Sequence, residues 1–168
     1  MPEPSRHFRH VIDSPAGPLT FGSFEGTLTH VLFGECELPH STERKSPVIA
    51  DAVEQVREYF RGRRRSFEVV IAPAARVFQS RVLRALSNVR FATLTTYGDI
   101  ARTIDAPRAW QAVGQAVGAN PIGIIIPCHR VLPASGLLGG FAGGSDAKKA
   151  LLHVEGFQVD SSGRVVRA

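Results

Sequence analysis

The sequence predicts two parts: an α/β N-terminal domain, in which a small antiparallel sheet carries a helix, and a mainly α-helical C-terminal domain with a helix-turn-helix. Short apolar segments separated by turn residues fill the first part, which is typical of strands. Apolar residues at helical spacing dominate the second part. Pro73-Ala74-Ala75 separates the two patterns, so we place the domains at residues 1–75 and 76–168.

The N-terminal domain is expected to begin with an antiparallel meander. Its strands are rich in apolar residues and are separated by the turn signals Asp13-Ser14-Pro15 and Glu25-Gly26. We place them at residues 8–12, 19–21 and 28–33. The polar segment 35–47 predicts a loop, the apolar spacing over 48–61 predicts a helix, and 67–71 predicts a further strand.

Helices are expected in the first half of the C-terminal domain. An amphipathic helix over 77–86 would turn inward Val77, Phe78, Val82 and Leu86. A second helix over 100–104 has Thr95 or Thr96 as its cap. Pro107 fits the first turn of a third helix, which would run to about Val117. Two short helices joined by a short break predict a helix-turn-helix, although a packed pair with no role in DNA binding gives the same pattern.

The rest of the domain is expected to hold one buried strand, one helix and a hairpin. Ile122 to Ile126 reads as the buried strand, and it leads directly into Pro127-Cys128-His129-Arg130-Val131. A glycine-rich segment follows over 136–144. We place the helix at residues 146–154 and the hairpin strands around Val159 and Val165.

Positive charge is concentrated in the second domain. The chain has a net charge of +5. Residues 1–75 carry nine Lys and Arg against ten Asp and Glu, whereas residues 76–168 carry eleven against five. Arginine forms planar, bidentate contacts with phosphate. This favours an anionic partner such as nucleic acid, although many basic proteins bind none.

Length and composition exclude several classes of protein. The chain has 168 residues, and 43% of them are hydrophobic, which is enough for a buried core. No apolar stretch approaches the length of about 18 residues that suggests a transmembrane helix. The start of the chain lacks the apolar centre of a secretory signal. The two cysteines, Cys36 and Cys128, cannot form a disulfide framework, so we expect a cytoplasmic protein that binds no membrane.

Cys128 is the candidate nucleophile. It follows a buried segment and a proline, and it is next to His129 and Arg130. Cationic neighbours lower the pKa of a thiol from about 8.5, and the thiolate is the reactive form. Adjacent side chains of an extended chain point in opposite directions, so His129 would reach the sulfur only through a turn or a bridging water. The alternative is that Cys128 is a small buried apolar residue.

The sequence predicts no cofactor and no metal. The glycine-rich segment lacks the Lys-Ser/Thr ending of a phosphate-binding loop, and the chain shows no dinucleotide-binding fingerprint. Cys36 lies close to His30 and His40 in the sequence, but a structural zinc site needs four ligands and no second cysteine is nearby. We therefore interpret Cys36 as a bystander.

Several motifs together resemble the O6-alkylguanine-DNA alkyltransferase family. They are Phe78-Gln79, Thr96-Tyr97-Gly98-Asp99-Ile100-Ala101, Asn120-Pro121, the Pro-Cys-His-Arg-Val run of residues 127–131, Gly140-Phe141-Ala142-Gly143-Gly144 and Glu155-Gly156. The Pro-Cys-His-Arg-Val run after the isoleucines is the most specific of them. The resemblance covers residues 76–156 densely, and Ser14-Pro15-Ala16-Gly17-Pro18-Leu19 is similar to the family's first hairpin.

The resemblance implies DNA repair by an irreversible, single-turnover transfer of an alkyl group from the O6 atom of guanine to the protein. Cys128 matches the acceptor, and His129 matches the residue that takes the thiol proton through a water. Glu155 matches the carboxylate that orients this histidine, Tyr97 matches the donor of a proton to guanine, and Asn120 matches the tie between the helix-turn-helix and the active-site strand.

The resemblance also implies a partner, double-stranded DNA containing O6-alkylguanine, from which the target base is flipped through the minor groove. The implied DNA-binding residues are Arg108, Gln111, Ala112, Gly114 and Arg130, and the implied pocket residues are Val131, Phe141 and Ala142. The expected state is a monomer, with assembly along DNA left open.

Two departures from the family pattern keep an alternative function open. Gln111 stands where the family usually has an arginine that fills the gap left by the flipped base, and Phe141 replaces a usual tyrosine. The alternative is an alkyltransferase-like sensor that binds lesions with little or no transfer, but such sensors lack the acceptor cysteine. The neighbouring Trp110 either packs between helices or is exposed near DNA, and we expect it to pack between helices.

Overall fold

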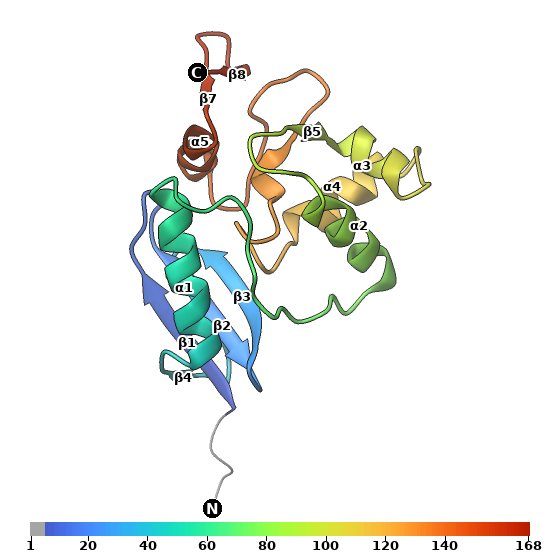
Figure 1. Cartoon of the computed structure of the whole chain (residues 1–168). Helices are drawn as coiled ribbons and strands as arrows, with labels where there is room; N and C mark the ends of the chain where they lie inside the picture. The colour runs from blue at the N-terminus through green and yellow to red at the C-terminus, as the bar shows by residue number, and fades with distance from the viewer. Residues whose placement is uncertain (1–5) are drawn as a thin grey trace, which may run out of the picture.

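A computed structural model describes residues 6–168 as a half with a sheet and one helix joined to a mainly helical half (Figure 1). Residues 1–5, with which the first predicted domain begins, lie outside the described residues. The predicted division into an N-terminal part that contains a sheet and a C-terminal part that is mainly helical is confirmed.

The N-terminal half is built on a four-stranded sheet in the order β3-β2-β1-β4. Strands β1 (His7–Ile12), β2 (Leu19–Phe24) and β3 (Thr27–Phe33) form the predicted antiparallel meander. The short strand β4 (Thr42–Glu43) pairs in parallel with β1. The prediction of a plain loop over 35–47 is wrong at β4, because two exposed polar residues give no apolar signal.

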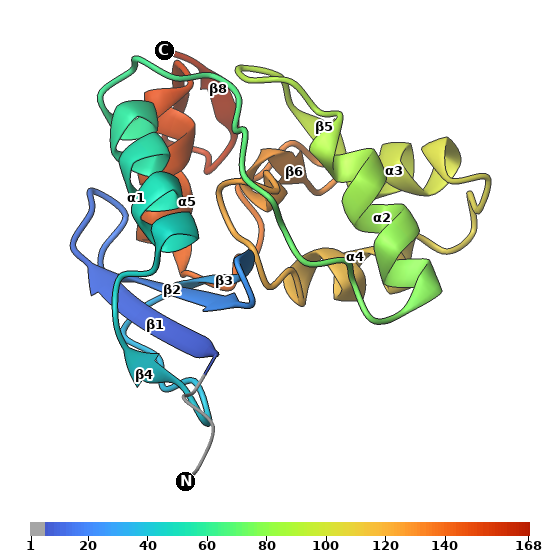
Figure 2. The same ribbon diagram turned by 60° about the horizontal axis from the view of Figure 1, so that its bottom comes forward.

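Helix α1 (Pro47–Phe60) covers one face of this sheet, as the two ribbon views show (Figure 1, Figure 2). Ser46 caps it by accepting a hydrogen bond from the amide of Ile49, and Pro47 occupies the first turn. Its buried face comprises Ile49, Ala52, Val53, Gln55, Val56 and Tyr59. Val53, Val56 and Tyr59 belong to the apolar spacing that predicted this helix.

The strand predicted over 67–71 is wrong. This segment touches the edge strand β3 at one isolated bridge between Leu28 and Ile71. The Leu28 amide donates to the Val70 carbonyl at 2.9 Å, and the Ala72 amide donates back to Leu28 at 2.8 Å. One bridge is too short for a strand, and a run of apolar residues cannot reveal how long a neighbouring strand stays within reach.

Three packed helices begin the C-terminal half: α2 (Val77–Ser87), α3 (Tyr97–Thr103) and α4 (Trp110–Gly118). Helices are present in the three predicted places, with three corrections. The second helix begins at Tyr97, directly after its cap Thr96, and not at residue 100. The Val77 side chain is 81% exposed, because this first residue of α2 lies beyond the core. Pro107 lies in the turn before α4 and not in its first helical turn, since the helix begins only at Trp110.

The segment from Ile122 to Ile126 is buried as predicted, but it is a series of turns and not a strand. The Ile125 amide bonds to the Gly123 carbonyl at 2.7 Å, and the Ile126 amide bonds to Ile122 at 3.0 Å. Ile124 has a φ of 69°, a left-handed conformation that is unfavourable for a β-branched residue. Apolar content alone predicted burial and could not predict this path.

The remaining elements surround the turn that carries Cys128. The 3-10 helix η1 (Cys128–Arg130) leads into β6 (Val131–Leu132), which pairs in parallel with β5 (Thr95–Thr96). Helix α5 (Ser145–Val154) and the hairpin of β7 (Phe157–Val159) and β8 (Val165–Arg167) confirm the predictions for the end of the chain.

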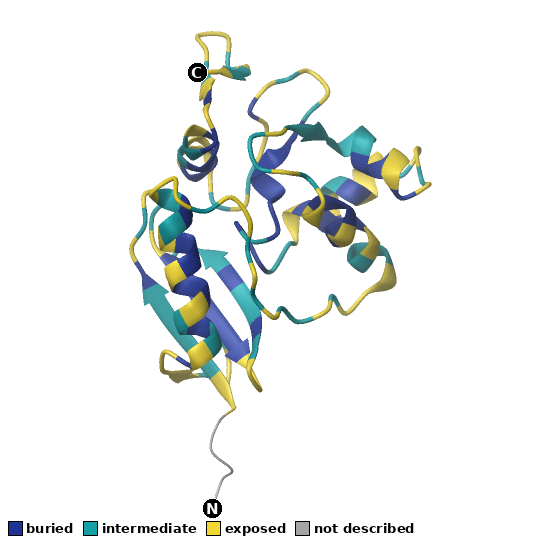
Figure 3. Cartoon of the chain, in the orientation of Figure 1, coloured by how far each residue is buried: buried dark blue, intermediate teal, exposed yellow. Residues whose placement is uncertain are grey.

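One hydrophobic core runs through both halves (Figure 3). The edge strand β3 contributes the joining backbone bonds: the Val31 amide donates to Pro121, and the Gly123 amide donates to Val31, both at 2.9 Å. Helices α1 and α5 also contact each other (Figure 2). Among the described residues, none of the helices has the length and apolar character needed to cross a membrane.

Candidate active site

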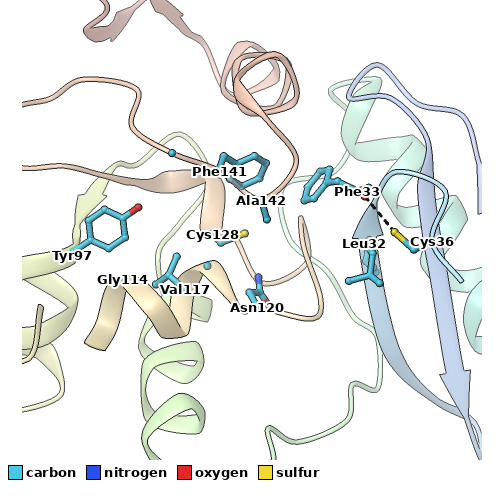
Figure 4. A pocket seen from close by; sticks show the side chains of 13 residues that line it. Leu32, Phe33, Cys36, Tyr97, Gly114, Val117, Asn120, Cys128, Phe141 and Ala142 are labelled. Carbon is cyan, nitrogen blue, oxygen red and sulfur yellow. Dashed lines mark hydrogen bonds between the residues drawn. The ribbon is translucent and has the colours of Figure 1, made fainter. Parts of the chain in front are cut away.

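A cavity of about 400 Å³ lies where the two halves meet, and Cys128 forms part of its wall (Figure 4). The N-terminal half contributes Val31, Leu32, Phe33 and Cys36. The C-terminal half contributes Tyr97, Gly114, Val117, Gly118, Asn120, Gly140, Phe141 and Ala142. Most of this lining is apolar, with few polar groups near the sulfur, a composition typical of ligand pockets.

Cys128 begins the 3-10 helix η1 and not an extended segment. Its amide bonds to the Ile126 carbonyl at 2.8 Å, so the chain turns at this point. Successive side chains of a 3-10 helix point about 120° apart. Cys128 therefore faces the cavity, while the fully buried His129 points into the protein. The expected extended geometry is wrong, and the turn that the sequence reasoning required is present.

Burial raises the pKa of the Cys128 thiol. The side chain of Asn120, the backbone of Cys128 and His129, and the positive charge of Lys148 act in the opposite direction, but burial is the larger effect. The thiol is therefore protonated at neutral pH, and a nearby base must remove its proton before the sulfur can act as a nucleophile.

Glu155 accepts hydrogen bonds at both of its carboxylate oxygens. His129 Nε2 and the Tyr59 hydroxyl bond to Oε2, the latter at 2.7 Å. Arg130 Nε and the Ala92 amide bond to Oε1, each at 2.8 Å. Burial alone would raise the pKa of Glu155, but the hydrogen bonds and charges of His129 and Arg130 lower it to about 2. The carboxylate is therefore ionised at neutral pH.

Burial lowers the pKa of His129, and the bond to Glu155 only partly opposes this effect. The ring is therefore neutral at neutral pH. Since an ionised Glu155 can only accept a hydrogen bond, the ring proton lies on Nε2. Nδ1 is buried and has no hydrogen-bond partner among the described residues, so it is the nitrogen that can accept a proton.

Asn120 connects the end of α4 to the segment before Cys128. Its side-chain amide donates to the Ile126 carbonyl at 2.9 Å, and its side-chain oxygen accepts from the Ile122 amide at 3.0 Å. Both bonds stabilise the irregular backbone that presents the thiol, because this backbone lacks the regular pairing of a strand.

Tyr97 reaches the cavity from the first residue of α3. Thr96 caps this helix: its hydroxyl accepts from the Asp99 amide at 3.1 Å, and the Asp99 carboxylate accepts from the Thr96 amide at 3.3 Å. Burial raises the pKa of Tyr97, and the nearby Cys128 raises it further by a smaller effect. The phenol therefore keeps its proton at neutral pH and can donate it to a group in the cavity.

The start of α4 presents a surface beside this cavity. Arg108, Gln111 and Ala112 are exposed, while Gly114 lines the cavity close to the Tyr97 ring. Trp110 is 54% exposed, so the prediction that it packs between helices is wrong. It is the first residue of α4, and the helix turns its indole away from the core.

Two predicted site residues lie elsewhere. Arg130 is only 5% exposed, and it donates to Glu155 and to the Val89 carbonyl, so its guanidinium does not fit the predicted contact with DNA. Val131 is fully buried and lies outside the cavity lining, unlike Phe141 and Ala142. Its carbonyl accepts a hydrogen bond from Lys148.

The sequence reasoning missed three contributors to this site. Tyr59 looks like a core residue because it continues the apolar stripe of α1. Lys148 is fully buried in α5. The other two lysines of the chain, Lys45 and Lys149, are exposed, so residue type alone could not predict that Lys148 is buried. Cys36, interpreted as a bystander, lines the cavity, where its thiol donates to the Phe33 carbonyl at 3.5 Å (Figure 4).

Two family profiles match the chain and together cover most of it. Residues 8–73 match the 6-O-methylguanine DNA methyltransferase ribonuclease-like domain, and residues 77–157 match the DNA binding domain of the same family. The first profile ends at residue 73 and the second begins at residue 77.

Curated relatives agree with these profiles. A methylated-DNA–protein-cysteine methyltransferase of Methanosarcina acetivorans is 40% identical over 150 residues, covering 87% of this chain and 96% of the relative. A protein of the same name from Mycobacterium bovis is 42% identical over 152 residues, covering 89% and 92%.

Solved structures show the same fold. The crystal structure of O6-methylguanine methyltransferase from Mycobacterium tuberculosis has a TM-score of 0.81 and 40% identity, covering 89% of this chain and 92% of that one. The structure of the M. tuberculosis protein in complex with DNA has the same TM-score, 41% identity, and coverage of 88% and 92%.

Proposed function

The chain belongs to the 6-O-methylguanine DNA methyltransferase family, and from this premise we propose that Cys128 is the residue that accepts the alkyl group. The activity is that of a methylated-DNA–protein-cysteine methyltransferase, a suicide alkyl transfer in DNA repair. The observation that carries the assignment is geometric: the Cys128 thiol faces the cavity, while the His129–Glu155 pair lies directly behind it.

Proton transfer activates the thiol. His129 Nδ1 takes the Cys128 proton through a water molecule, and the ionised Glu155 stabilises the imidazolium that forms. The thiolate then attacks the alkyl carbon on guanine O6. A sulfur–carbon bond forms as the carbon–oxygen bond breaks, and the electron pair of that bond stays with guanine.

Tyr97 assists the departure of guanine. Its phenol keeps its proton at neutral pH and lines the same cavity as the sulfur, so it can donate that proton to the guanine ring as negative charge develops there. The resulting thioether cannot return the alkyl group, and each molecule therefore acts once. Asn120 holds the backbone that presents the thiol during this step.

The substrate is double-stranded DNA containing O6-alkylguanine, and α3 with α4 serves as a helix-turn-helix that binds it. The guanine must leave the base stack to reach a cavity with a buried thiol, at a cost of a few kcal/mol. Gln111 lies on the exposed face of α4 and fills the gap in the duplex, with Ala112 and Gly114 beside it, while Arg108 contacts a phosphate.

The protein acts as a cytoplasmic monomer, with residues 1–75 and 76–168 as its two domains. The continuous core supports joint folding of both domains. The DNA-facing surface and the cavity belong largely to the second domain, which also carries the excess of positive charge. Assembly of several copies along DNA would be detected as cooperative binding.

Mass spectrometry tests this function. The protein is mixed with a duplex that carries isotopically labelled O6-methylguanine, and the expected result is a gain of one methyl group on Cys128, with no more than one per molecule. Cys128→Ser should bind the duplex without gaining mass. Tight lesion binding by the native chain without any gain of mass would instead support the sensor, the alternative that Gln111 and Phe141 keep open.

A further inference from the structure

We propose that Tyr59, which comes from the N-terminal half, is a positioning residue for alkyl transfer. Its hydroxyl holds Glu155, and through Glu155 the His129 ring, in the orientation that directs Nδ1 toward the thiol proton. This inference rests on the proposed function. It assigns a role in the reaction to a half of the chain that otherwise supplies the sheet, part of the core and one wall of the cavity.

The contacts of the Tyr59 hydroxyl carry the proposal. It lies 2.7 Å from Glu155 Oε2, 3.3 Å from His129 Nε2 and 3.3 Å from the Leu151 carbonyl. A hydroxyl has one proton to donate, and the shortest of these contacts is to the ionised carboxylate. The Tyr59 oxygen then faces the Nε2–H group of His129, so one hydroxyl touches both members of the pair.

Packing fixes the ring independently of its hydroxyl. Tyr59 is fully buried near the end of α1, and its ring centroid lies 5.4 Å from that of Phe60, 5.7 Å from Phe67 and 6.2 Å from Phe91. These apolar neighbours would hold a phenylalanine in the same place. Replacement of Tyr59 by phenylalanine therefore removes the hydroxyl while it preserves the packing.

The four donors around Glu155 explain why the hydroxyl matters. Arg130 and Ala92 hold Oε1, and His129 and Tyr59 hold Oε2. Without the Tyr59 hydroxyl, Oε2 keeps only the histidine as a donor, so the carboxylate is less restrained about its Cγ–Cδ bond on the side that faces His129. Burial and the neighbouring Glu155 raise the pKa of Tyr59, so the hydroxyl stays a donor throughout the pH range of the reaction.

The loss of the Tyr59 hydroxyl as a donor to Glu155 should also change the pKa of His129 in a defined direction. When Glu155 accepts one hydrogen bond fewer, its negative charge interacts more strongly with the protonated ring of His129. The imidazolium is then easier to form, so the pKa of His129 rises. The other charged groups that face the ring, Arg130 and Lys148, both lower this pKa and are unchanged in the variant. A rise in the pKa of His129 moves the acid limb of the pH–rate profile to higher pH.

The test measures single-turnover transfer of a labelled methyl group from duplex DNA as a function of pH, for the native chain and for Tyr59→Phe. We expect the rate constant of Tyr59→Phe at neutral pH to fall about tenfold, as for a lost hydrogen bond to a charged group. We also expect its acid limb to shift upward. Unfolding curves report whether the variant is folded.

Ser23→Ala is the matched control. Ser23 is a buried residue of the same half, and its hydroxyl bonds to the Ser46 hydroxyl at 2.8 Å, away from Glu155. This variant also loses a buried hydroxyl, but it should keep the native rate and pH profile. A native rate and profile in Tyr59→Phe would overturn the proposal, and so would equal changes in both variants.

A measurement on the native chain keeps the proposal testable if Tyr59→Phe does not fold. Nitrogen-15 NMR of labelled histidine reports which ring nitrogen of His129 carries the proton, and the proposal requires Nε2. A proton on Nδ1 would contradict it. Absence of methyl transfer by the native chain would contradict the proposed function itself, whereas normal transfer with an unaffected Tyr59→Phe would contradict only the role of Tyr59.

Discussion

Burial shifts the pKa values of Cys128 and His129 in opposite directions: it raises that of the thiol and lowers that of the imidazole. Both groups are therefore uncharged in the resting protein, and in the proposed mechanism the charged pair forms only when the sulfur begins to react. The ionised Glu155 beside His129 is present before that moment, so the charge that stabilises the imidazolium needs no rearrangement.

The pH dependence of transfer follows from the lowered pKa of His129. A base acts in its unprotonated form, and a histidine with a pKa below 6.5 stays unprotonated at mildly acidic pH. We expect the transfer rate to decline on the acid side with a midpoint below pH 6.5. Single-turnover rates between about pH 4.5 and 8 measure this. A midpoint at or above pH 6.5 would contradict the assignment of a buried, neutral His129 as the base.

Lys148 gives a stability prediction at the same scale. Its buried ammonium group donates to the carbonyls of Val131 at 3.0 Å, Leu138 at 2.6 Å and Gly140 at 3.4 Å. Lys148→Met would leave these carbonyls without the donor and should lower the free energy of unfolding by about 1–3 kcal/mol. Lys149→Met, on the exposed side of the same helix, is the control and should stay within about 0.5 kcal/mol of the native chain.

The pH dependence of that stability also has a defined sign. Burial lowers the pKa of Lys148 to about 8, below the value of about 10.4 for an unfolded lysine. Between these values the unfolded chain binds more protons, so this residue makes the native chain more stable as the pH rises from 8 to 10. Because the raised pKa values of Cys128, Tyr59 and Tyr97 act in the opposite direction over this range in every variant, the contribution of Lys148 is read as a difference between chains. Urea unfolding at both pH values should show that the stability of the native chain relative to Lys148→Met increases from pH 8 to 10, whereas its stability relative to Lys149→Met stays the same.

Individual residues of the site differed in how far the sequence could predict them. Cys128 and His129 are adjacent and follow a proline, so the local sequence was enough to identify them as candidate site residues. Tyr59 occupies a helical core position, and its partner Glu155 is 96 residues away in the chain, so no local pattern connects the two. Long-range hydrogen bonds of this kind arise from packing between halves, which sequence spacing does not encode.

Secondary structure elements show the same division between local and long-range information. The helices at 47–60, 77–87 and 145–154 were predicted to within one or two residues, because an apolar stripe repeats along each of them. The segments 67–71 and 122–126 were predicted as strands and are not. Their apolar residues signal burial, but strand formation also requires a neighbouring chain at the right distance.

Helix α3 offers a prediction at the scale of one element. Thr96 and Asp99 cap it reciprocally, and the next residue after the cap is Tyr97. Thr96→Ala should lower the free energy of unfolding by about 1 kcal/mol, and it should slow transfer because the start of the helix positions the phenol. Denaturant unfolding and single-turnover rates measure the two effects.

Thr103→Ala is the control for this variant. Thr103 lies at the opposite end of α3, where its exposed hydroxyl donates to the Asp99 carbonyl at 2.9 Å. It should change stability by no more than about 0.5 kcal/mol and leave transfer unaffected. If Thr96→Ala transferred methyl groups at the native rate, the capping box would have no part in placing Tyr97.

At the scale of the whole molecule, the two halves build one site. The cavity has walls from both, the edge strand β3 bonds to the segment that precedes Cys128, and Tyr59 reaches Glu155 across the interface. The uneven distribution of charge divides the same halves by role. The first half lies close to neutrality, whereas the second holds the exposed face of α4 and the excess of positive charge, which arises mainly because it has fewer acidic residues.

This distribution predicts how salt affects the binding of duplex DNA. Each contact between a cationic side chain and a phosphate releases condensed counterions, so the logarithm of affinity falls with the logarithm of salt concentration by about 0.9 per contact. Arg108 is exposed in the turn before α4, and Arg57 is exposed on α1. Replacement of either by alanine removes one positive charge, so both variants have the same net charge.

Arg108→Ala should weaken duplex binding at every salt concentration and reduce the salt slope by about one contact, whereas Arg57→Ala should leave the slope unchanged. Fluorescence anisotropy across a salt series measures both slopes with the same duplex. Equal losses in the two variants would mean that net charge alone attracts DNA. A loss confined to Arg108→Ala would instead place a phosphate at the start of α4, because only a local contact distinguishes two arginines of equal charge.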